Sequence, residues 1–260
     1  MRSKRLKSMS HAWGQSMISS SENGTLVIGA AQGIGEASAR HLARQAWCGP
    51  LVLADRQYEK VEAVAESIRS AGGNAKAFSV DLSDHRTIVA LADAAGPITR
   101  VALVAGVIER KPAREMTVDA FERVMRINTI GIYLAAQEFA NRMIAAGQQG
   151  AICAVSSVGG KRPIPDLAAY CASKAAVAMA LRVLCLDTMP KGIRINCVAP
   201  WVTDTAMMAS PADSYRQSIP RGKVNSPGDV AAAISFLLSP DSEAIGFREL
   251  TVDGGAQLGL

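Results

Sequence analysis

Three side chains in the second half of the chain have the types and spacing needed to move a proton at a carbon–oxygen bond. Tyr170 and Lys174 lie four residues apart in an alanine-rich run, so a helix would place them on one face. An ammonium group beside a phenol favours the phenolate, and we expect Lys174 to lower the pKa of Tyr170 from about 10. Ser157 follows a short apolar run, and its hydroxyl can hold a carbonyl or alcohol oxygen. These groups predict a proton-transfer site for an alcohol and ketone pair.

A second group of residues has the pattern of a dinucleotide-binding turn. Gly29, Gly33 and Gly35 separate an apolar run from a helical run. Glycine lets the backbone approach a pyrophosphate, and a helix N-terminus offers free N–H groups. Any tight strand–helix turn can use glycine, so this turn alone is weak evidence. Asp55 strengthens it, because a carboxylate at the end of the second strand can accept hydrogen bonds from the adenosine ribose.

The residues around this turn predict NAD rather than NADP. Asp55 would repel a 2′-phosphate, and Gln32, not a cation, precedes the second glycine. Arg56 is the residue that argues for NADP, and a solvated turn carboxylate is the alternative interpretation of Asp55. Asp81 closes the third predicted strand, where it can either meet the adenine amino group or cap the following helix.

Short β-like runs alternate with helical periods from residue 25 onward. Predicted strands are 25–28, 51–54, 75–80, 100–105, 151–155, 194–199 and 248–252. Predicted helices are 33–45, 58–71, 85–94, 117–146, 168–188 and 227–238. This alternation predicts an α/β fold, with one doubly wound parallel sheet of seven strands and helices on both faces. Ligands of such sheets bind at the carboxyl ends of strands, where the residues above lie.

Composition bounds the class of protein. The 260 residues are 49% hydrophobic and 5% aromatic, which predicts one large domain with an aliphatic core. The net charge is +5, and four of the basic residues are Arg2, Lys4, Arg5 and Lys7. The body is therefore nearly neutral, so we expect no nucleic-acid partner. Because no apolar run approaches transmembrane length, we expect no membrane association.

The domain boundaries follow from the same distribution of charge. Residues 1–22 read as a basic, disordered extension, and residues 23–260 as the folded domain. A transit peptide or an arm for an acidic partner is the alternative for the extension. Five cysteines without a CxxC pair predict reduced, buried thiols and a cytoplasmic protein. His11, His41 and His85 are scattered, and we expect no metal site.

The order and spacing of these motifs resemble the short-chain dehydrogenase/reductase family over roughly residues 25–260. The match rests on the glycine turn, Ser157, the Tyr170–Lys174 pair and the closing Val252-Asp253-Gly254-Gly255. The resemblance implies a Rossmann-type fold, a nicotinamide cofactor and a homotetramer, or a homodimer. It implies a catalytic tetrad of Asn128, Ser157, Tyr170 and Lys174. Residues assigned to the cofactor are Gly29, Gln32, Gly33, Ile34, Gly35, Asp55, Arg56, Asp81, Leu82, Ala105, Gly106, Tyr170, Lys174, Pro200 and Thr205.

Within that resemblance, each member of the tetrad has a role. Tyr170 takes the hydroxyl proton while hydride leaves the same carbon for the nicotinamide, and reduction runs in reverse. Lys174 tunes the phenol and binds the nicotinamide ribose, and Ser157 holds the substrate oxygen. Asn128 holds a water that passes protons to and from the lysine. An asparagine that breaks a helix before Gly131 is the alternative interpretation.

Four residues, at three places in the chain, depart from the family pattern. Ile28 replaces the usual Thr, and Leu103-Val104 replaces Asn-Asn, which removes side-chain hydrogen bonds near the adenosine half. The backbone path of Ala105 and Gly106 can survive these losses. Trp201 replaces the usual Gly after Pro200, so an indole stands beside the expected nicotinamide pocket.

The substrate can be narrowed by further motifs. The closing motif, together with Thr203-Asp204-Thr205 and Ile219-Pro220-x-Gly222-Lys223, looks like the 2,3-dihydro-2,3-dihydroxybenzoate dehydrogenases. The segment between Thr205 and Pro227, the family's substrate lid with Met207, Met208, Tyr215 and Ile219, is shorter here. This favours a small or accessible substrate, or else packing against a neighbouring subunit.

Two basic pairs follow the fourth and fifth predicted strands, Arg110-Lys111 and Lys161-Arg162. They favour an anionic substrate such as a carboxylated cyclic alcohol, unless they are solvated loop cations. The whole sequence thus predicts an NAD-dependent oxidoreductase acting on a secondary alcohol or ketone. The alternative is a non-catalytic dinucleotide-binding sensor or scaffold with the same fold, which uses the basic tail to find a partner.

Overall fold

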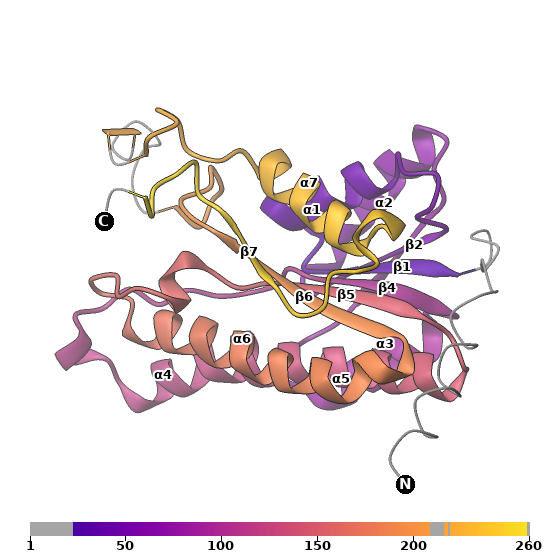
Figure 1. The fold of residues 1–260 in the computed structure, drawn as a ribbon, viewed down its shortest axis with the longest axis horizontal. Coiled ribbons are helices and arrows are strands. Elements are labelled where there is room, and N and C mark those ends of the chain that lie inside the picture. The colour runs from indigo at the N-terminus through magenta and orange to yellow at the C-terminus, as the bar shows by residue number, and fades with distance from the viewer. Residues whose placement is uncertain (1–22, 209–215, 218, 259–260) are drawn as a thin grey trace, which may run out of the picture.

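The computed structural model describes residues 23–208, 216–217 and 219–258. The predicted basic extension at 1–22 lies outside the described residues, as does Tyr215 of the predicted lid. Strands and helices alternate along nearly the whole described chain, and Figure 1 shows them as a sheet between two layers of helices.

Seven parallel strands form one sheet in the order β3-β2-β1-β4-β5-β6-β7. The strands are β1 (Gly24–Ile28), β2 (Leu51–Asp55), β3 (Ala75–Ser79), β4 (Ile98–Leu103), β5 (Gly150–Val155), β6 (Ile193–Pro200) and β7 (Glu249–Val252). The predicted doubly wound parallel sheet is confirmed. β1 pairs with both β2 and β4, so the strand order reverses there and a crevice opens at the carboxyl ends.

Helices cover both faces of this sheet (Figure 1). One face carries α1 (Gly33–Leu42), α2 (Tyr58–Ser70) and α7 (Pro227–Leu238). The other carries α3 (His85–Ala94), α4 (Val118–Met125), α5 (Ile132–Ala145) and α6 (Ala168–Thr188). Short 3₁₀ turns are η1 (Ala113–Glu115), η3 (Val158–Gly160), η4 (Met189–Lys191) and η6 (Pro240–Ser242).

The strands divide the interior into two cores because successive side chains point to opposite faces. Leu26 and Ile28 of β1 pack with buried residues of α3, α5 and α6. Val27, between them, packs with buried residues of α1, α2 and α7. Both faces of β1 are buried, as the near-continuous apolar strands of a parallel sheet require.

Most predicted strands and helices agree with the structure to within three residues at each end, and two differences have a clear structural cause. The single helix expected at 117–146 is interrupted by a π-helical segment, η2 (Arg126–Gly131), which separates α4 from α5. β4 ends at Leu103 rather than residue 105, because the N–H groups of Val104 and Ala105 both turn to the Ile28 carbonyl oxygen, at 2.9 and 3.0 Å. This turn lets the chain leave the sheet at its carboxyl edge.

Helix α6 is the most apolar long helix of the described chain. With the following turn it spans Ala168–Lys191, and among the described residues it is the one helix with the length and mean hydropathy, 1.5, to cross a membrane. Buried positions make up 44% of its apolar window, and it packs on β6, α5 and α4, as a core helix does. It leaves Met179, Val183 and Leu186 more than half exposed.

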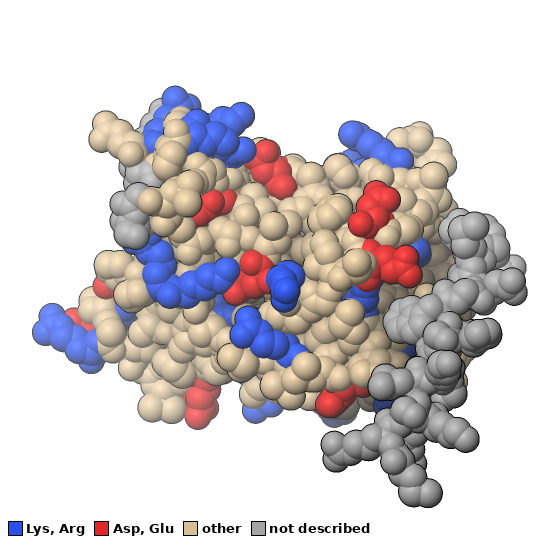
Figure 2. Space-filling view, in the orientation of Figure 1, with Lys and Arg blue, Asp and Glu red and all other residues tan. Residues whose placement is uncertain are grey.

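Charged side chains of both signs are interspersed over the centre of the face in Figure 2. Among the described residues many charged side chains pair; Arg69, for example, contacts Glu62 and Glu66, each at 2.6 Å. Pairs of this kind on the surface contribute about 0–1 kcal/mol each, so they say little about stability. The mixture of signs in Figure 2 leaves the centre of that face without a large patch of one charge.

Candidate active site

A cavity of about 380 Å³ opens at the carboxyl edge of the sheet. Every residue assigned to the cofactor from the sequence lines it, as do Ser157, Tyr170 and Lys174. Asn128 is the one predicted catalytic residue that does not line the cavity, and its side chain is fully buried behind it. The fold therefore brings the glycine turn and the proton-transfer residues to one site.

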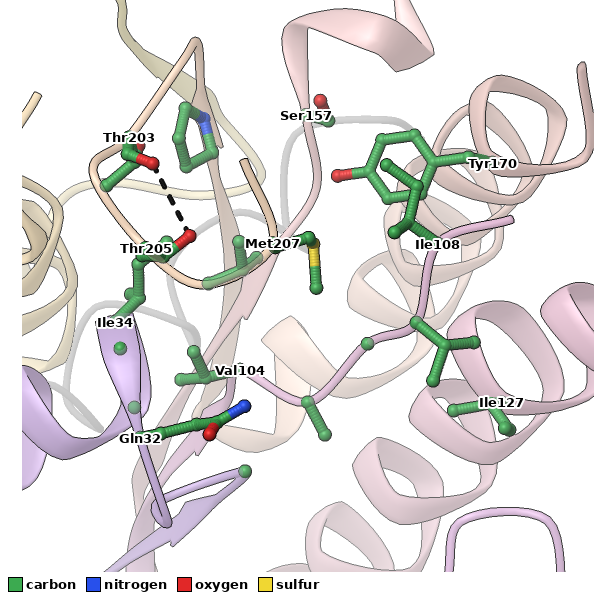
Figure 3. A pocket seen from close by; sticks show the side chains of 18 of the residues that line it. Gln32, Ile34, Val104, Ile108, Ile127, Ser157, Tyr170, Thr203, Thr205 and Met207 are labelled. Atoms are coloured by element: carbon green, nitrogen blue, oxygen red, sulfur yellow. Dashed lines mark hydrogen bonds between the residues drawn. The ribbon is translucent and has the colours of Figure 1, made fainter. Parts of the chain in front are cut away.

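The hydroxyl of Tyr170 points into the open centre of this cavity (Figure 3). Tyr170 lies in the first turn of α6, and Ser157 follows β5 on the same side of the cavity. The Ser157 Oγ accepts a hydrogen bond from the Gly159 N–H at 3.0 Å, which orients the hydroxyl at the start of η3. Ile108 stands beside the tyrosine, and Ile127 lines the cavity further from it, so the reacting end of the cavity has apolar walls.

These walls raise the pKa of Tyr170 above its usual value, because burial disfavours the phenolate. The hydrogen bond with Ser157 and the charge of Arg110 act in the opposite direction. The prediction that Lys174 lowers the pKa of this phenol is wrong for the folded chain. Its Nζ lies 5.7 Å from the centre of the tyrosine ring and contributes no resolved effect. Tyr170 therefore holds its proton near neutral pH.

Lys174 is almost completely buried, one turn further along α6. Its Nζ donates a hydrogen bond to the Val155 carbonyl oxygen at 2.7 Å, where β5 ends. Burial lowers the pKa of Lys174 to about 8. The side chain can therefore gain or lose a proton close to neutral pH, as a proton relay must.

Asn128 lies within the π-helical segment η2. Its Oδ1 accepts from the Val107 N–H and its Nδ2 donates to the Val107 carbonyl, both at 2.8 Å. The Nδ2 also donates to Ser173 Oγ at 3.1 Å. The side-chain amide thus fastens the loop after β4 to α6, and a π-segment of this kind commonly marks a functional site. Gly106 lies next to both the Asn128 amide and the Lys174 amine.

Ser173 is a site residue that the sequence analysis missed. Its Oγ donates to the Tyr170 carbonyl at 2.7 Å and accepts from Asn128, so it joins the helix of the tyrosine to η2. Helical spacing offers a signal, since Ser173 is three residues after Tyr170 and one before Lys174. The backbone groups of Val107 and Val155 gave no such signal, because any residue type supplies them.

At the other end of the cavity, glycines allow close backbone contacts. A Cβ at Gly29, which has φ of +92°, would lie 2.4 Å from the Ala105 nitrogen. A Cβ at Gly35 would overlap the Gly29 carbonyl oxygen. Gly33, with φ of +58°, lies under Thr205, whose Cγ2 would be 3.3 Å from an added Cβ. The first and last thirds of the chain therefore meet over the glycine turn.

The N-terminus of α1 opens into the cavity. Its N-cap residue, Gln32, makes no side-chain capping hydrogen bond, and Gly33, Ile34 and Gly35 of the first turn all line the cavity. Free N–H groups and the positive end of the helix dipole suit a pyrophosphate. A glycine turn on the cavity wall, packed too closely for side chains and next to such a helix end, forms a cradle that fits a dinucleotide.

Two carboxylates line the adenosine end of this cradle. Asp55 Oδ2 accepts from the Ala31 N–H at 3.2 Å, and Oδ1 accepts from the Gln57 N–H at 2.9 Å, so it braces the glycine turn. Asp81 Oδ1 accepts from the N–H and the hydroxyl of Ser83, at 2.8 and 2.7 Å. The following helix is capped by Asp84, so Asp81 is not its N-cap and remains on the cavity wall.

The departures from the family pattern fall in the core and on the cavity wall. Ile28 and Leu103 are buried in one hydrophobic core, and the backbone path of Ala105 survives through its bond to Ile28. Trp201 lines the cavity, and its buried Nε1 has no hydrogen-bond partner. The guanidinium carbon of Arg162 lies 5.3 Å from the centre of the Trp201 ring, so a cation–π contact holds this wall.

The segment after Trp201 is pinned at its two ends. The Asp204 N–H donates to the Asn225 carbonyl at 2.9 Å, and the Asn225 N–H donates to Val202 at 3.1 Å. The Asn225 Nδ2 donates to the Val252 carbonyl at 2.6 Å, which ties the pin to β7. Thr205 bonds back to Thr203, and Met207 reaches over the cavity (Figure 3).

Comparison with known proteins gives three relatives of similar length. The short chain dehydrogenase family profile matches residues 23–215. The chain is 37% identical over 245 residues to cis-4-hydroxycyclohexanecarboxylate dehydrogenase of Sinomonas cyclohexanicum, covering 90% of this chain and 96% of that protein. It is 32% identical over 252 residues to 2,3-dihydro-2,3-dihydroxybenzoate dehydrogenase of Bacillus subtilis (strain 168), covering 90% and 95%. It is 30% identical over 243 residues to 2,5-dichloro-2,5-cyclohexadiene-1,4-diol dehydrogenase of Sphingobium indicum, covering 90% and 96%.

Solved structures agree with the fold. The 3-ketoacyl-(acyl-carrier-protein) reductase of Brucella melitensis, complexed with NADH, superposes with a TM-score of 0.83 at 30% identity, covering 91% of this chain and 98% of that one. A protein from Beutenbergia cavernae with NADP bound at low occupancy gives 0.85 at 29% identity, covering 92% and 98%. The relatives therefore include holders of both dinucleotides.

Proposed function

Because this chain belongs to the short-chain dehydrogenase family of oxidoreductases, we propose that it interconverts a secondary alcohol and a ketone with NAD as cofactor. The observation that carries the proposal is the direction of the Tyr170 hydroxyl. It points into the same cavity that the glycine turn and the N-terminus of α1 line. When bound there, a nicotinamide supplies the acceptor or donor of hydride.

Tyr170 is the proposed general acid and base. Its raised pKa keeps the phenol protonated near neutral pH, so it can donate a proton to a ketone oxygen during reduction. During oxidation it must first lose that proton, and the rate should rise with pH. Ser157 holds the substrate oxygen beside the phenol, because its own hydroxyl is oriented by Gly159.

Lys174 and Asn128 support the proton path in different ways. With a pKa of about 8, the Lys174 amine can exchange a proton when the phenol changes state. Asn128 is a positioning residue, since both N–H groups of its amide are bonded to Val107 and Ser173. If Asn128 holds a water, the water must donate its hydrogen bond to the backbone or side-chain carbonyl oxygen of Asn128, because both amide N–H groups are already used.

Asp55 supports NAD over NADP. Its carboxylate lies on the cavity wall at the end of β2 and would repel a 2′-phosphate. Arg56 lines the same wall and would favour NADP, so kinetics with both dinucleotides test the assignment. We expect a higher kcat/KM with NAD, and we expect Asp55→Asn to lower the ratio of the NAD value to the NADP value. A wild-type preference for NADP would overturn this assignment.

We propose a ring alcohol with an anionic group as the substrate class. The three sequence relatives named above, but not the two solved structures, act on ring alcohols by their names, and the names of two of them, at 37% and 32% identity, specify a carboxylate. The third acts on a neutral ring diol, so the preference for a ring and the preference for a negative charge must be tested with separate substrates.

We also propose a homo-oligomer in the cytoplasm, a tetramer or a dimer. The exposed apolar side chains Met179, Val183 and Leu186 on α6 offer a face for a second copy. All five cysteines are free, and four are buried, which suits a reducing compartment. Sedimentation of the purified chain as a monomer at micromolar concentration would contradict the oligomer.

The decisive assay follows absorbance at 340 nm with each dinucleotide and a panel of ring alcohols and ketones. The proposed function requires turnover that Tyr170→Phe abolishes. A chain that binds dinucleotide without turning over any member of the panel would instead be the sensor or scaffold predicted as the alternative.

A further inference from the structure

The structure separates the four basic residues that follow β4 and β5. Lys161 turns away from the cavity toward β7. Its Nζ lies 3.2 Å from Glu249 Oε2 and donates to Thr251 Oγ1, also at 3.2 Å. Its charge is therefore compensated. Glu249 is held in turn by Ser156, whose Oγ donates to it at 2.6 Å.

Arg162 supports the wall of the cavity from behind. Its guanidinium stacks on Trp201, and it does not itself line the cavity. Lys111 does not line the cavity either, although its backbone N–H joins the two loops through Asp166 at 3.0 Å. Neither side chain is placed to meet a substrate directly.

Arg110 is different from the other three. It lines the cavity together with Tyr170 and Ile108, and its side chain is exposed at the mouth. The neighbouring acid, Glu109, is already paired with Arg123 at 2.7 Å. No ion pair to Arg110 occurs within the described residues. Its charge also lowers the pKa of the Tyr170 phenol, so it lies within electrostatic reach of the reacting oxygen.

The charges along the described cavity wall are unevenly distributed. Its two acids, Asp55 and Asp81, both belong to the adenosine end, after β2 and β3. At the α6 end the charged side chains are Lys174 and Arg110, and Lys174 is committed to the Val155 carbonyl. A ligand at that end therefore meets one accessible positive group, surrounded by apolar side chains.

We infer that Arg110 binds the anionic group of the substrate at the mouth of the cavity, while the alcohol carbon lies at Tyr170. The inference rests on the proposed function and adds to it the residue that selects the charged substrate. A guanidinium suits a carboxylate because its planar fork can donate two parallel hydrogen bonds. Apolar side chains around the ring of the substrate would strengthen this contact by excluding water.

The test compares cis-4-hydroxycyclohexanecarboxylate with its neutral methyl ester, using Arg110→Gln and, as the matched control, Lys111→Gln. We expect Arg110→Gln to lower kcat/KM for the acid relative to the ester by about 10- to 100-fold, mostly through KM, as for a lost hydrogen bond to a charged group. Lys111→Gln should leave the ratio within about 2-fold of wild type, as expected for a cation that does not line the cavity. Arg110→Lys should give an intermediate ratio, since it keeps the charge without the fork.

The outcomes separate this inference from the proposed function. Equal losses in Arg110→Gln and Lys111→Gln, or a wild type that uses the ester as well as the acid, would overturn the role of Arg110 and leave the dehydrogenase intact. A wild type that oxidises neither compound, nor any neutral ring alcohol, would overturn both. A selective loss for the acid in Arg110→Gln supports both.

Discussion

The two ends of the cavity are built from different parts of the chain. At the α1 end the close contacts join backbone atoms, as where Gly29 approaches Ala105 and Gly35 approaches Gly29. At the α6 end side chains bond to backbone groups, as where the Asn128 amide bonds the Val107 backbone and the Lys174 amine bonds the Val155 carbonyl. An added methyl group should therefore damage the first end, whereas the second end should be damaged by removing a functional group.

Tyr170→Phe should produce the largest difference between the two ends, because it should lower turnover without changing dinucleotide binding. Loss of the phenol oxygen should lower kcat by about 10²- to 10⁴-fold, the usual contribution of a general acid or base. Dinucleotide affinity should stay close to wild type, because the α1 end is untouched. Steady-state kinetics and fluorescence titration would measure both, with the exposed Tyr58→Phe as control. Equal loss of binding and turnover would contradict the division into two ends.

Gly35→Ala tests the backbone end. The new Cβ would overlap the Gly29 carbonyl, so α1 must shift, with an expected cost of about 1–3 kcal/mol in unfolding free energy and weaker dinucleotide binding. Gly72→Ala is the matched control, since it has φ of +86° and no atom within 4 Å of its Cβ. Denaturant unfolding should show strain in both variants but lost binding only in Gly35→Ala. Unchanged dinucleotide affinity in Gly35→Ala would contradict the assignment of the glycine turn as the dinucleotide-binding site.

Asn128→Ala tests the side-chain end away from the reacting atoms. It would leave the Val107 N–H and carbonyl without their partner, at a cost of about 1–3 kcal/mol. We expect kcat to fall as the loop after β4 loosens, with dinucleotide affinity less affected. Ser173→Ala removes one of the same bonds and should have a smaller effect on both stability and kcat. A larger effect in Ser173→Ala would show that Asn128 does not organise this end.

Lys174→Met should change stability by an amount that depends on pH. The folded-state pKa of Lys174, about 8, lies below the usual 10.5, so burying the charge costs stability fully below pH 8. Between pH 8 and 10.5 the unfolded chain holds more protons, and wild-type stability gains from this group as pH rises. Any advantage of Lys174→Met should therefore narrow above pH 8, by at most about 1.4 kcal/mol per pH unit. Urea unfolding across pH 7–9 would measure this against the exposed control Lys60→Met, and a pH-independent difference would contradict it.

The contrast between the ends also explains what the sequence could predict. The glycine turn was predictable because close backbone contact admits few residue types, and Tyr170 and Lys174 were predictable because helical spacing brings them together. The direction of the pKa shift of Tyr170 was not, because it depends on how apolar the walls become after folding. An asparagine before a glycine is compatible with a helix break, but the π-helical segment found there accompanies bonds from Asn128 to Val107 and Ser173, which are distant in sequence.

Loop cations show the same limit. Arg110, Lys161 and Arg162 follow strands in the same manner, and sequence alone made them equivalent. In the folded chain Lys161 forms an ion pair with Glu249, and Arg162 forms a cation–π contact with Trp201. Arg110 lies on the cavity wall. Partner choice among surface charges depends on tertiary distances that no local pattern encodes.

The hydrogen bond between Asp204 and Asn225 fixes the two ends of the intervening segment next to each other, whatever the length of the segment. Backbone hydrogen bonds close it at the base, and the Asn225 amide anchors that base to β7, outside the segment itself. A longer segment grafted from a relative after Met208, so that Thr205 keeps its place over Gly33, should change which alcohols enter while the sheet, the glycine turn and the tyrosine keep their places. Substrate choice in this fold can thus change during evolution while the cofactor-binding and proton-transfer residues stay the same.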